Sequence, residues 1–286
     1  MIRQCQGEYP VGLMCGALRV TPSGFYAWRK RELSERAVKD RQILVDIKAV
    51  HRRTRRSFGS PRVHLAIGEK HECGRHRIAR IMRENGIEAK PKKRFRRTTD
   101  SRHGFAVAPN VLNRCFHVAE PDRVWASDIT YLWTREGWLY LAVTLDLFSR
   151  KVVGWATSRH VDTDLVLRSL RNALQTRQPE PGLIHHSDRG SQYASNDFRR
   201  VLKGWDITPS MSRKGDCWDN AVVESFFGSL KVEWLDDVVH DTRVQASRDV
   251  FAYIETFYNT HRFHSTIGGL SPLQFEQAHS AKLCVH

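Results

Sequence analysis

Three acidic residues occupy positions from which their carboxylates could meet. Asp128 lies inside an apolar run that predicts a strand, and Asp188 ends a second, shorter strand, where Gly190 lets the chain turn. Glu224 lies in a predicted helix, with 35 residues between it and Asp188. Ligands gather beyond the carboxyl ends of strands in open α/β sheets, so the three acids could converge on one point. Three carboxylates would suit an ion such as Mg²⁺, which prefers oxygen ligands.

Each of the three acids also has an ordinary structural interpretation. Asp128 could bond a neighbouring strand, Asp188 could cap its turn, and Glu224 could be a solvated helix residue. Asp146 is a competing acid and a possible fourth member of the group. Its place before a turn favours a different role, in which the carboxylate bonds backbone groups and fixes the turn.

Two adjacent histidines, His185 and His186, precede Asp188 in its strand. Successive side chains in a strand point to opposite faces, so at most one of the two faces the site. We expect both to serve in packing or in supporting the site rather than as metal ligands.

The segment "DNAVVESFFGSLK", residues 219–231, predicts one long helix. At about 100° per residue, Asn220, Glu224 and Lys231 fall within about 40° of one line along it. Gly228 lies on the other side of the apolar stripe and leaves room for a close neighbour. Glu224 is therefore expected at the margin of a buried face, where a rigidly anchored helix can present an oxygen. The stripe beside that line consists of Val223, Phe227, Leu230 and Trp234.

The elements that must position these acids follow the order β-β-β-α-β-α-β-α, which predicts an α/β fold with a mixed sheet flanked by helices. The first three strands form an antiparallel meander, because short turns connect them. A further helix is expected around residues 242–260. The predicted strands are 123–133, 138–148, 150–158, 181–188 and 207–212, and the intervening helices are 163–177 and 196–205.

The first third of the chain carries the whole of its net charge of +15. Residues 1–100 contain 25 Lys and Arg against 10 Asp and Glu, whereas residues 101–286 contain 21 of each. A basic module beside a neutral one indicates nucleic-acid binding by the first, although a solvated basic face would look the same.

Two helix-turn-helix-like units are predicted within this basic part, at residues 10–31 and 58–87, around a basic amphipathic helix at 36–56. Thr21, with Pro22 following, is the predicted N-cap of one helix, and Ser60, with Pro61 following, is the predicted N-cap of another. Gly86 is a predicted helix stop. Four arginines on the last helix suit contacts with DNA phosphates: Arg75, Arg77, Arg80 and Arg83.

The chain divides into three predicted parts. Residues 1–87 form the basic helical region, 88–122 a basic linker, and 123–286 the α/β core with its C-terminal helices. The charge run "KPKKRFRRTTDSRHG" in the linker fits either a flexible tether or an ordered strap along DNA. No apolar run approaches the roughly 18–20 residues that span a bilayer, and residues 1–18 make a poor secretory signal. These features predict a cytoplasmic protein.

Several longer sequence segments in the core resemble the integrase catalytic core of bacterial insertion-sequence transposases. The resemblance is to the insertion-sequence-three family, in its downstream-frame (OrfB-type) product, and covers almost the whole chain. One small departure is Phe58, which opens "FGSPR" where Tyr is expected. The segments that carry the resemblance are "WASDITYL", "GWLYLAVTLDLFSRKVVGW", "LIHHSDRGSQYAS", "SMSRKGDCWDNAVVESFFGSLKVEW" and "YIETFYNTHRFHSTIGGLSPLQFE".

This resemblance implies a ribonuclease H-like fold and an Asp-Asp-Glu metal triad formed by Asp128, Asp188 and Glu224. The expected cofactor is Mg²⁺, or Mn²⁺ in its place, as two ions, with Asp128 shared between them. Asp188 would hold one ion and Glu224 the other. Asn220 and Lys231 are expected to contact the DNA, Lys231 through the phosphates bound to the same metals.

The resemblance also implies the reaction and the partners. The enzyme would nick the terminal inverted repeats of a mobile element and drive the released 3′-hydroxyl into target DNA, acting as an oligomer at the bacterial nucleoid. An upstream-frame partner, joined as a frameshift fusion, would supply end-specific binding. Two alternatives stay open: a nuclease of the same fold that only hydrolyses, and a DNA-binding regulator with an inactive core.

Overall fold

The computed structural model describes residues 2–91, 107–213, 217–235 and 237–283, with the side chains of 217, 218 and 283 left undescribed. Its described part contains one five-stranded sheet in the order β3-β2-β1-β4-β5. β2 pairs antiparallel with β1 and β3, whereas β4 pairs parallel with β1 and β5. The predicted mixed sheet is therefore confirmed. The strands are β1 (Val124–Thr134), β2 (Gly137–Asp146), β3 (Val152–Ser158), β4 (Ile184–Ser187) and β5 (Thr208–Met211).

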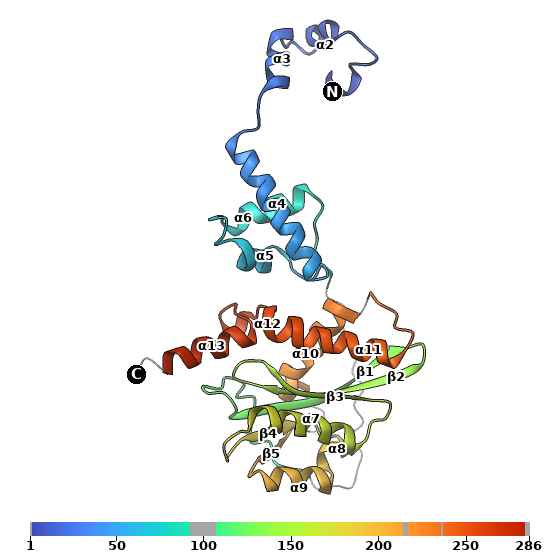
Figure 1. The fold of residues 1–286 in the computed structure, drawn as a ribbon, viewed down its shortest axis with the longest axis vertical. Coiled ribbons are helices and arrows are strands. Elements are labelled where there is room, and N and C mark those ends of the chain that lie inside the picture. The colour runs from blue at the N-terminus through green and yellow to red at the C-terminus, as the bar shows by residue number, and fades with distance from the viewer. Residues whose placement is uncertain (1, 92–106, 214–216, 236, 284–286) are drawn as a thin grey trace.

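Helices cover both faces of the sheet (Figure 1). One face carries α7 (Thr163–Arg177), α8 (Ser191–Ala194) and α9 (Asn196–Gly204) over a buried apolar cluster around Trp125. The other face carries α10 (Ala221–Leu230), α11 (Arg243–Phe251), a π-helical segment (Ala252–Tyr258) and α12 (Asn259–His261). The C-terminal helix α13 (Pro272–Leu283) packs Phe275 against Phe148. Both faces are thus closed, as in other α/β layers.

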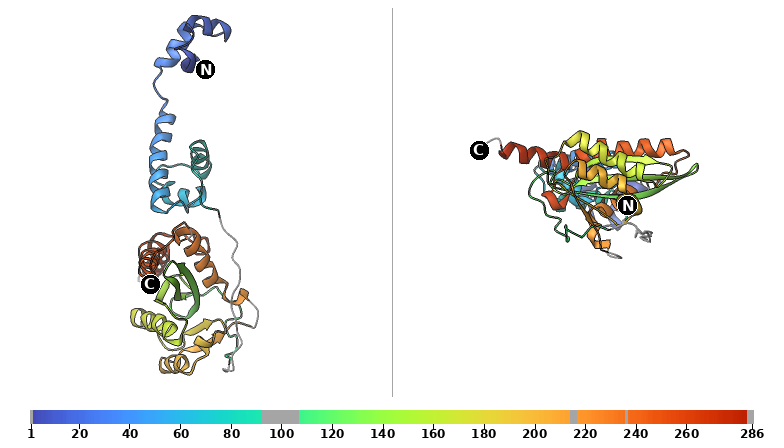
Figure 2. Two further views of the ribbon diagram at one scale, coloured as in Figure 1. Left: turned by 90° about the vertical axis from the view of Figure 1, so that its right-hand side faces the viewer. Right: turned by 90° about the horizontal axis from the view of Figure 1, so that it is seen from below.

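The N-terminal helices extend away from the sheet, so the molecule is elongated (Figures 1 and 2). Thr21 caps α3 as predicted, because its side chain accepts a hydrogen bond from the Gly24 amide. The predicted cap at Ser60 is wrong. The cap residue is Gly59, and Ser60 is the first helical residue, with Pro61 in the first turn, where its missing N–H costs nothing. The helices are α1 (Ile2–Cys5), α2 (Val11–Ala17), α3 (Pro22–Lys30), α4 (Glu35–Arg53), α5 (Ser60–Ile67) and α6 (Arg75–Glu84).

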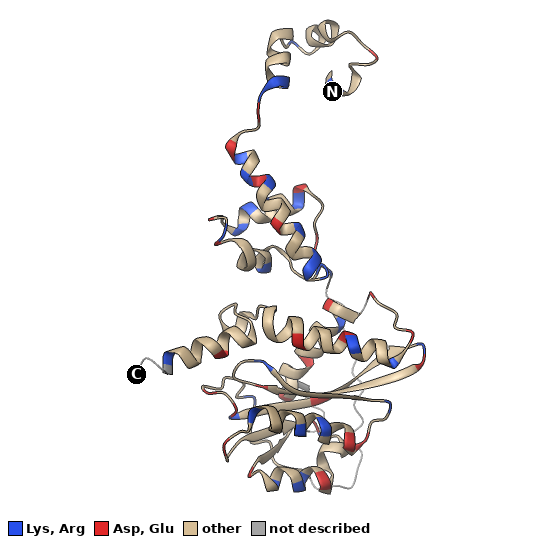
Figure 3. Cartoon of the chain, viewed as in Figure 1, with Lys and Arg blue, Asp and Glu red and all other residues tan. Residues whose placement is uncertain are grey.

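The charge distribution follows the sequence pattern: Lys and Arg gather at the end of α3 and along α4 and α6, and both signs are spread over the core (Figure 3). The division of the chain at residues 87 and 122 stays a prediction. Most of the charge run in the predicted linker, residues 92–104, lies outside the described residues. No helix in the described ranges is long and apolar enough to cross a bilayer.

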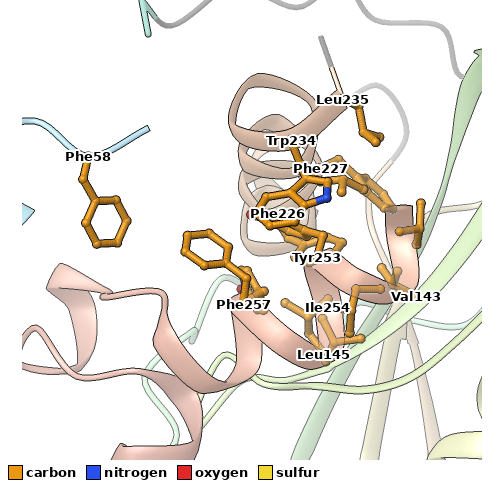
Figure 4. Close-up of a cluster of buried hydrophobic side chains, with 14 of the residues drawn as sticks. Phe58, Val143, Leu145, Phe226, Phe227, Trp234, Leu235, Tyr253, Ile254 and Phe257 are labelled. Atoms are coloured by element: carbon orange, nitrogen blue, oxygen red, sulfur yellow. The ribbon is translucent and has the colours of Figure 1, made fainter. Parts of the chain in front are cut away.

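An aromatic cluster packs the segment between α4 and α5 against the core (Figure 4). Phe58 is almost fully buried, with ring centroids 6.0 Å from Phe257 and 5.8 Å from Phe263. Phe257 in turn stacks on Trp234, 5.3 Å away. The Arg62 guanidinium also lies over the Phe58 ring, 5.4 Å from its centre.

A buried ion-pair network lies beside this cluster. The Glu233 carboxylate accepts bonds from Arg62 Nη1 (2.9 Å), Arg262 Nε (2.8 Å) and the Tyr253 hydroxyl (3.1 Å). Burial raises the pKa of Glu233, but the Arg262 and Arg62 guanidiniums outweigh it and hold that pKa below its ordinary value. Since Arg62 belongs to α5, the network ties the helical unit to the chain that follows α10.

The predicted single helix over 219–231 is divided in three. A 3₁₀ turn (Cys217–Asn220) precedes α10, and a π-helical turn (Lys231–Leu235) follows it. π-helical turns insert an extra residue and re-aim the side chains that follow. Here the turn contains the buried Glu233 and Trp234, which contact groups from α5 and from the C-terminal helices.

Candidate active site

The pairing of β1 with β4 places two of the predicted acids side by side. The last pair between β1 and β4 is Ser127 with Ser187. Asp128, which continues β1, and Asp188, which follows β4, therefore lie side by side at the edge where β4 ends. Paired strands lie about 4.8 Å apart. Asp128 Oδ1 accepts a bond from the Ile129 amide (2.7 Å), and Asp188 Oδ1 accepts one from the Gly190 amide (2.9 Å). Each bond orients one carboxylate oxygen.

The third acid comes from α10, which packs against β1. Asn220, at the start of α10, donates through Nδ2 to the Ser127 carbonyl (3.2 Å), one residue before Asp128. Glu224 follows one turn later and is exposed. Four other residues of α10 are buried against the sheet and the C-terminal helices: Val223, Phe226, Phe227 and Leu230. Glu224 therefore lies at the margin of a buried face.

The charges at this edge act on one another. Desolvation raises the pKa of Asp128 well above its ordinary value, and the like charges of Asp188 and Glu224 raise it further, while Lys231 lowers it. Such effects require the four groups to be near neighbours. Lys231 Nζ also lies 5.4 Å from the centre of the Tyr131 ring on β1. Asp128, Asp188, Glu224 and Lys231 thus share one electrostatic environment.

The donor set at this edge fits a hard cation. It consists of carboxylates and of the buried Asn220 Oδ1, which has no hydrogen-bond partner within the described part of the chain. Concentrated negative charge with oxygen donors suits Mg²⁺. The side chains are nevertheless not arranged as a finished metal centre: the described ranges contain no group of three His, Cys, Asp or Glu residues that would hold an ion.

The two histidines before Asp188 are buried and hydrogen bonded. His185 Nε2 lies 2.8 Å from Ser127 Oγ, and its ring packs against Tyr193 and Phe198. His186 lies 2.9 Å from Ser210 Oγ through Nδ1 and 3.2 Å from Ser212 Oγ through Nε2. Both bridge β4 to neighbouring segments, which agrees with the supporting role expected for them.

His185 should make stability depend on pH. Burial, with His186 beside it, lowers the pKa of His185 to about 3, against about 6.5 in an unfolded chain. The unfolded state therefore binds a proton at His185 that the folded state does not bind. As a result, the free energy of unfolding falls as the pH drops below about 6.5. Between pH 7 and pH 5, His185 should cost roughly 2 kcal/mol of unfolding free energy.

Urea unfolding of the wild type and of His185→Gln at pH 7 and pH 5 measures this effect. Glutamine can still bond Ser127 but does not titrate, so the variant should lose less stability on acidification. Burial lowers the pKa of His186 to about 4. His186 therefore contributes part of the pH dependence of stability in both proteins. An equal loss in the two proteins would contradict the assignment.

Asp146 lies apart from the three acids. Its Oδ1 accepts a bond from the Phe148 amide (3.0 Å) and its Oδ2 one from the Asp122 amide (3.3 Å). Burial raises the pKa of Asp146 to about 7. The carboxylate thus fixes the turn after β2, as the sequence favoured, and Asp122 and Arg177 rather than Asp128 are its charged neighbours.

The four arginines of α6 differ in their surroundings. Arg77 and Arg80 are half-buried and bond Asp40 on α4 at 2.7 and 2.6 Å, which holds the two helices together. Arg75 and Arg83 are exposed. A role in DNA contact stays a prediction for all four, as it does for Lys231 and Asn220.

Sequence reasoning missed one residue beside the site, Asp219. Its carboxylate is completely buried and accepts bonds from Asn110, Arg114 and Arg213. These partners come from segments far apart in the sequence, so only its position directly before Asn220 could have drawn attention to it.

Family models match three stretches of the chain. A model described as an integrase core domain matches residues 118–217, and a second of the same description matches residues 205–272. A model of an HTH-like domain matches residues 38–95. The matched ranges contain Asp128, Asp188 and Glu224 and also α5 and α6.

Similar proteins extend the match to nearly the whole chain. Transposase InsF of insertion sequence IS3A from Escherichia coli K12 is 40% identical over 283 residues, which cover 98% of both chains. A 31 kDa protein of insertion element IS600 from Shigella sonnei is 42% identical, over 92% of this chain and 97% of its own. Among solved structures, the HTLV-2 integrase catalytic core domain aligns with 54% of this chain and 96% of its own, at 18% identity and a TM-score of 0.43.

Proposed function

This chain belongs to the IS3 family of insertion-sequence transposases and is a DNA transposase, and we propose that Asp128, Asp188 and Glu224 form its metal-dependent catalytic centre. The observation that carries the proposal is the strand register. Ser127 pairs with Ser187, so Asp128, the next residue of β1, lies beside Asp188, which follows the end of β4, and Glu224 is close enough to raise the pKa of Asp128.

The three carboxylates would hold Mg²⁺, or Mn²⁺ in its place, and two ions would serve the attacking and leaving oxygens of a phosphodiester displacement. The chain's own groups orient this site. The Ile129 and Gly190 amides each fix one carboxylate oxygen, and Asn220 ties α10 to β1. Lys231 supplies positive charge beside Asp128, where a DNA phosphate would gain from it.

The substrates we propose are the terminal inverted repeats of the mobile element and a target DNA. The reaction releases a 3′-hydroxyl at an element end and joins it to the target, so the chain works on the bacterial chromosome. We also propose that several copies assemble on DNA, together with an upstream-frame partner that selects the ends.

The test is a product assay on a duplex that carries the terminal repeat of the element. With Mg²⁺, the purified protein should nick the repeat and join its 3′-end to a second duplex, and a chelator should abolish both products. Hydrolysis without joined strands would favour a nuclease of the same fold. Binding without cleavage would favour a regulator with an inactive core.

A further inference from the structure

A group of arginines lies at the same edge of the sheet as the three acids. Arg114 and Arg213 both bond the buried Asp219 carboxylate, Arg114 through Nε (2.9 Å) and Arg213 through Nε (3.0 Å) and Nη2 (2.9 Å). Arg189 donates through Nε to the Ser212 carbonyl. Each guanidinium is thus anchored by an acceptor of the protein.

Backbone bonds fix the place of this group. The Ser212 amide donates to the Ser187 carbonyl (2.9 Å), so Arg213 follows directly beyond the ends of β4 and β5. Arg189 is the residue after Asp188, and Asp219 is the residue before Asn220. The arginines therefore border the segments from which the proposed metal ligands come.

Asp219 carries its negative charge at neutral pH. Its hydrogen bonds with Arg213, reinforced by Arg114, hold its pKa far below the ordinary value. The Arg213 amide adds another bond (2.9 Å), and Asn110 Nδ2 another (2.9 Å). The Asp219 carboxylate is completely buried, whereas the side chains of Arg114 and Arg213 are 43% and 49% exposed.

Such an arrangement favours an anion. A guanidinium presents its donors in a planar fork that matches a phosphate, and it does not lose its charge. An arginine whose Nε edge is already fixed has given up much of its rotamer entropy before a ligand arrives. Here the buried Asp219 carboxylate orders two arginines that both reach the surface.

We propose that Arg114, Arg189 and Arg213 form a phosphate-binding cluster, preorganised by Asp219 and the Ser212 carbonyl, that grips the backbone of the DNA strand entering the carboxylate site. The inference rests on the proposed function for its ligand. The cluster positions the strand, and the carboxylates carry out the chemistry.

The experiment measures binding of the full-length protein to a random-sequence DNA duplex, with a chelator present, at increasing salt. Each lost phosphate contact should make the negative slope of log K against log salt shallower by about 0.9 on a duplex. Arg213→Gln and Arg114→Gln should each show this loss together with weaker binding. Arg200→Gln is the matched control, because Arg200 on α9 is 79% exposed and forms a local ion pair with Asp197 of the same helix. Slopes equal to the wild type in both variants would overturn the proposal.

Asp219→Asn separates preorganisation from simple charge. The variant gains one positive charge, so binding would tighten if the arrangement of the arginines were irrelevant. The proposal expects weaker binding instead, and tighter binding would contradict it. If this variant fails to fold, Arg114→Gln and Arg213→Gln still decide, because both side chains are half-exposed. Binding is measured without metal, so the proposed chemistry can fail in the cleavage assay without affecting this result.

Discussion

Asp188→Asn should abolish nicking and strand transfer while DNA binding survives. The substitution keeps the size of the side chain and an oxygen that can accept the Gly190 amide bond, but it removes the negative charge. An amide is a weaker ligand for a hard cation than a carboxylate. We expect both rates to fall by at least about 10³-fold, which corresponds to about 4 kcal/mol of transition-state stabilisation.

The readout is the yield of nicked and joined strands under single-turnover conditions, with binding measured on the same duplex. Asp197→Asn is the matched control, because Asp197 on α9 is an exposed aspartate that pairs with Arg200. It should retain wild-type rates. Wild-type rates in Asp188→Asn would contradict the assignment of the triad.

Arg262→Met should be among the most destabilising single changes in this chain. Arg262 donates to Glu233 through Nε (2.8 Å) and Nη2 (2.9 Å), and both side chains are at most 8% exposed. Removing one partner leaves a buried charge that is only partly compensated, which typically costs about 3–5 kcal/mol. Arg62 and the Tyr253 hydroxyl still bond Glu233, so the lower end of this range is expected. Urea unfolding measures the loss.

The double variant Arg262→Met with Glu233→Leu is the control. Replacing both buried partners by apolar groups removes the charge as well as its counter-ion, so much of the stability should return. Arg62, which is 29% exposed, can then turn to solvent. A double variant less stable than Arg262→Met would show that the network acts through something other than buried charge.

Much of this fold can be predicted from the sequence because the patterns that specify its elements are local. The apolar strands, the amphipathic pattern of α7 and the Thr21 cap each depend on a few consecutive residues, and the structure has them where the sequence predicts. The convergence of Asp128 and Asp188 needed only the parallel pairing of their strands. The resemblance of the longer sequence segments to a known family predicted the fold family and the reaction.

The missing parts depend on contacts between distant segments. Nothing local in the sequence marks Glu233 as buried, because its partners Arg62 and Arg262 lie far from it along the chain. Asp219 likewise gathers groups from two other segments. The π-helical turn after α10 contains Glu233 and Trp234, whose partners are distant in the sequence, and the choice of Gly59 over Ser60 as a cap shifts a helix start by one residue.

Metal rescue at position 188 tests the central claim most directly. A cysteine thiolate is a soft ligand that Mg²⁺ disfavours and Mn²⁺ accepts more readily. Asp188→Cys should be inactive in the strand-transfer assay with Mg²⁺ and should regain measurable activity with Mn²⁺, whereas Asp188→Asn should show less rescue. If Asp188→Cys is as active as the wild type with Mg²⁺, Asp188 is not a metal ligand and the three acids do not form the catalytic centre.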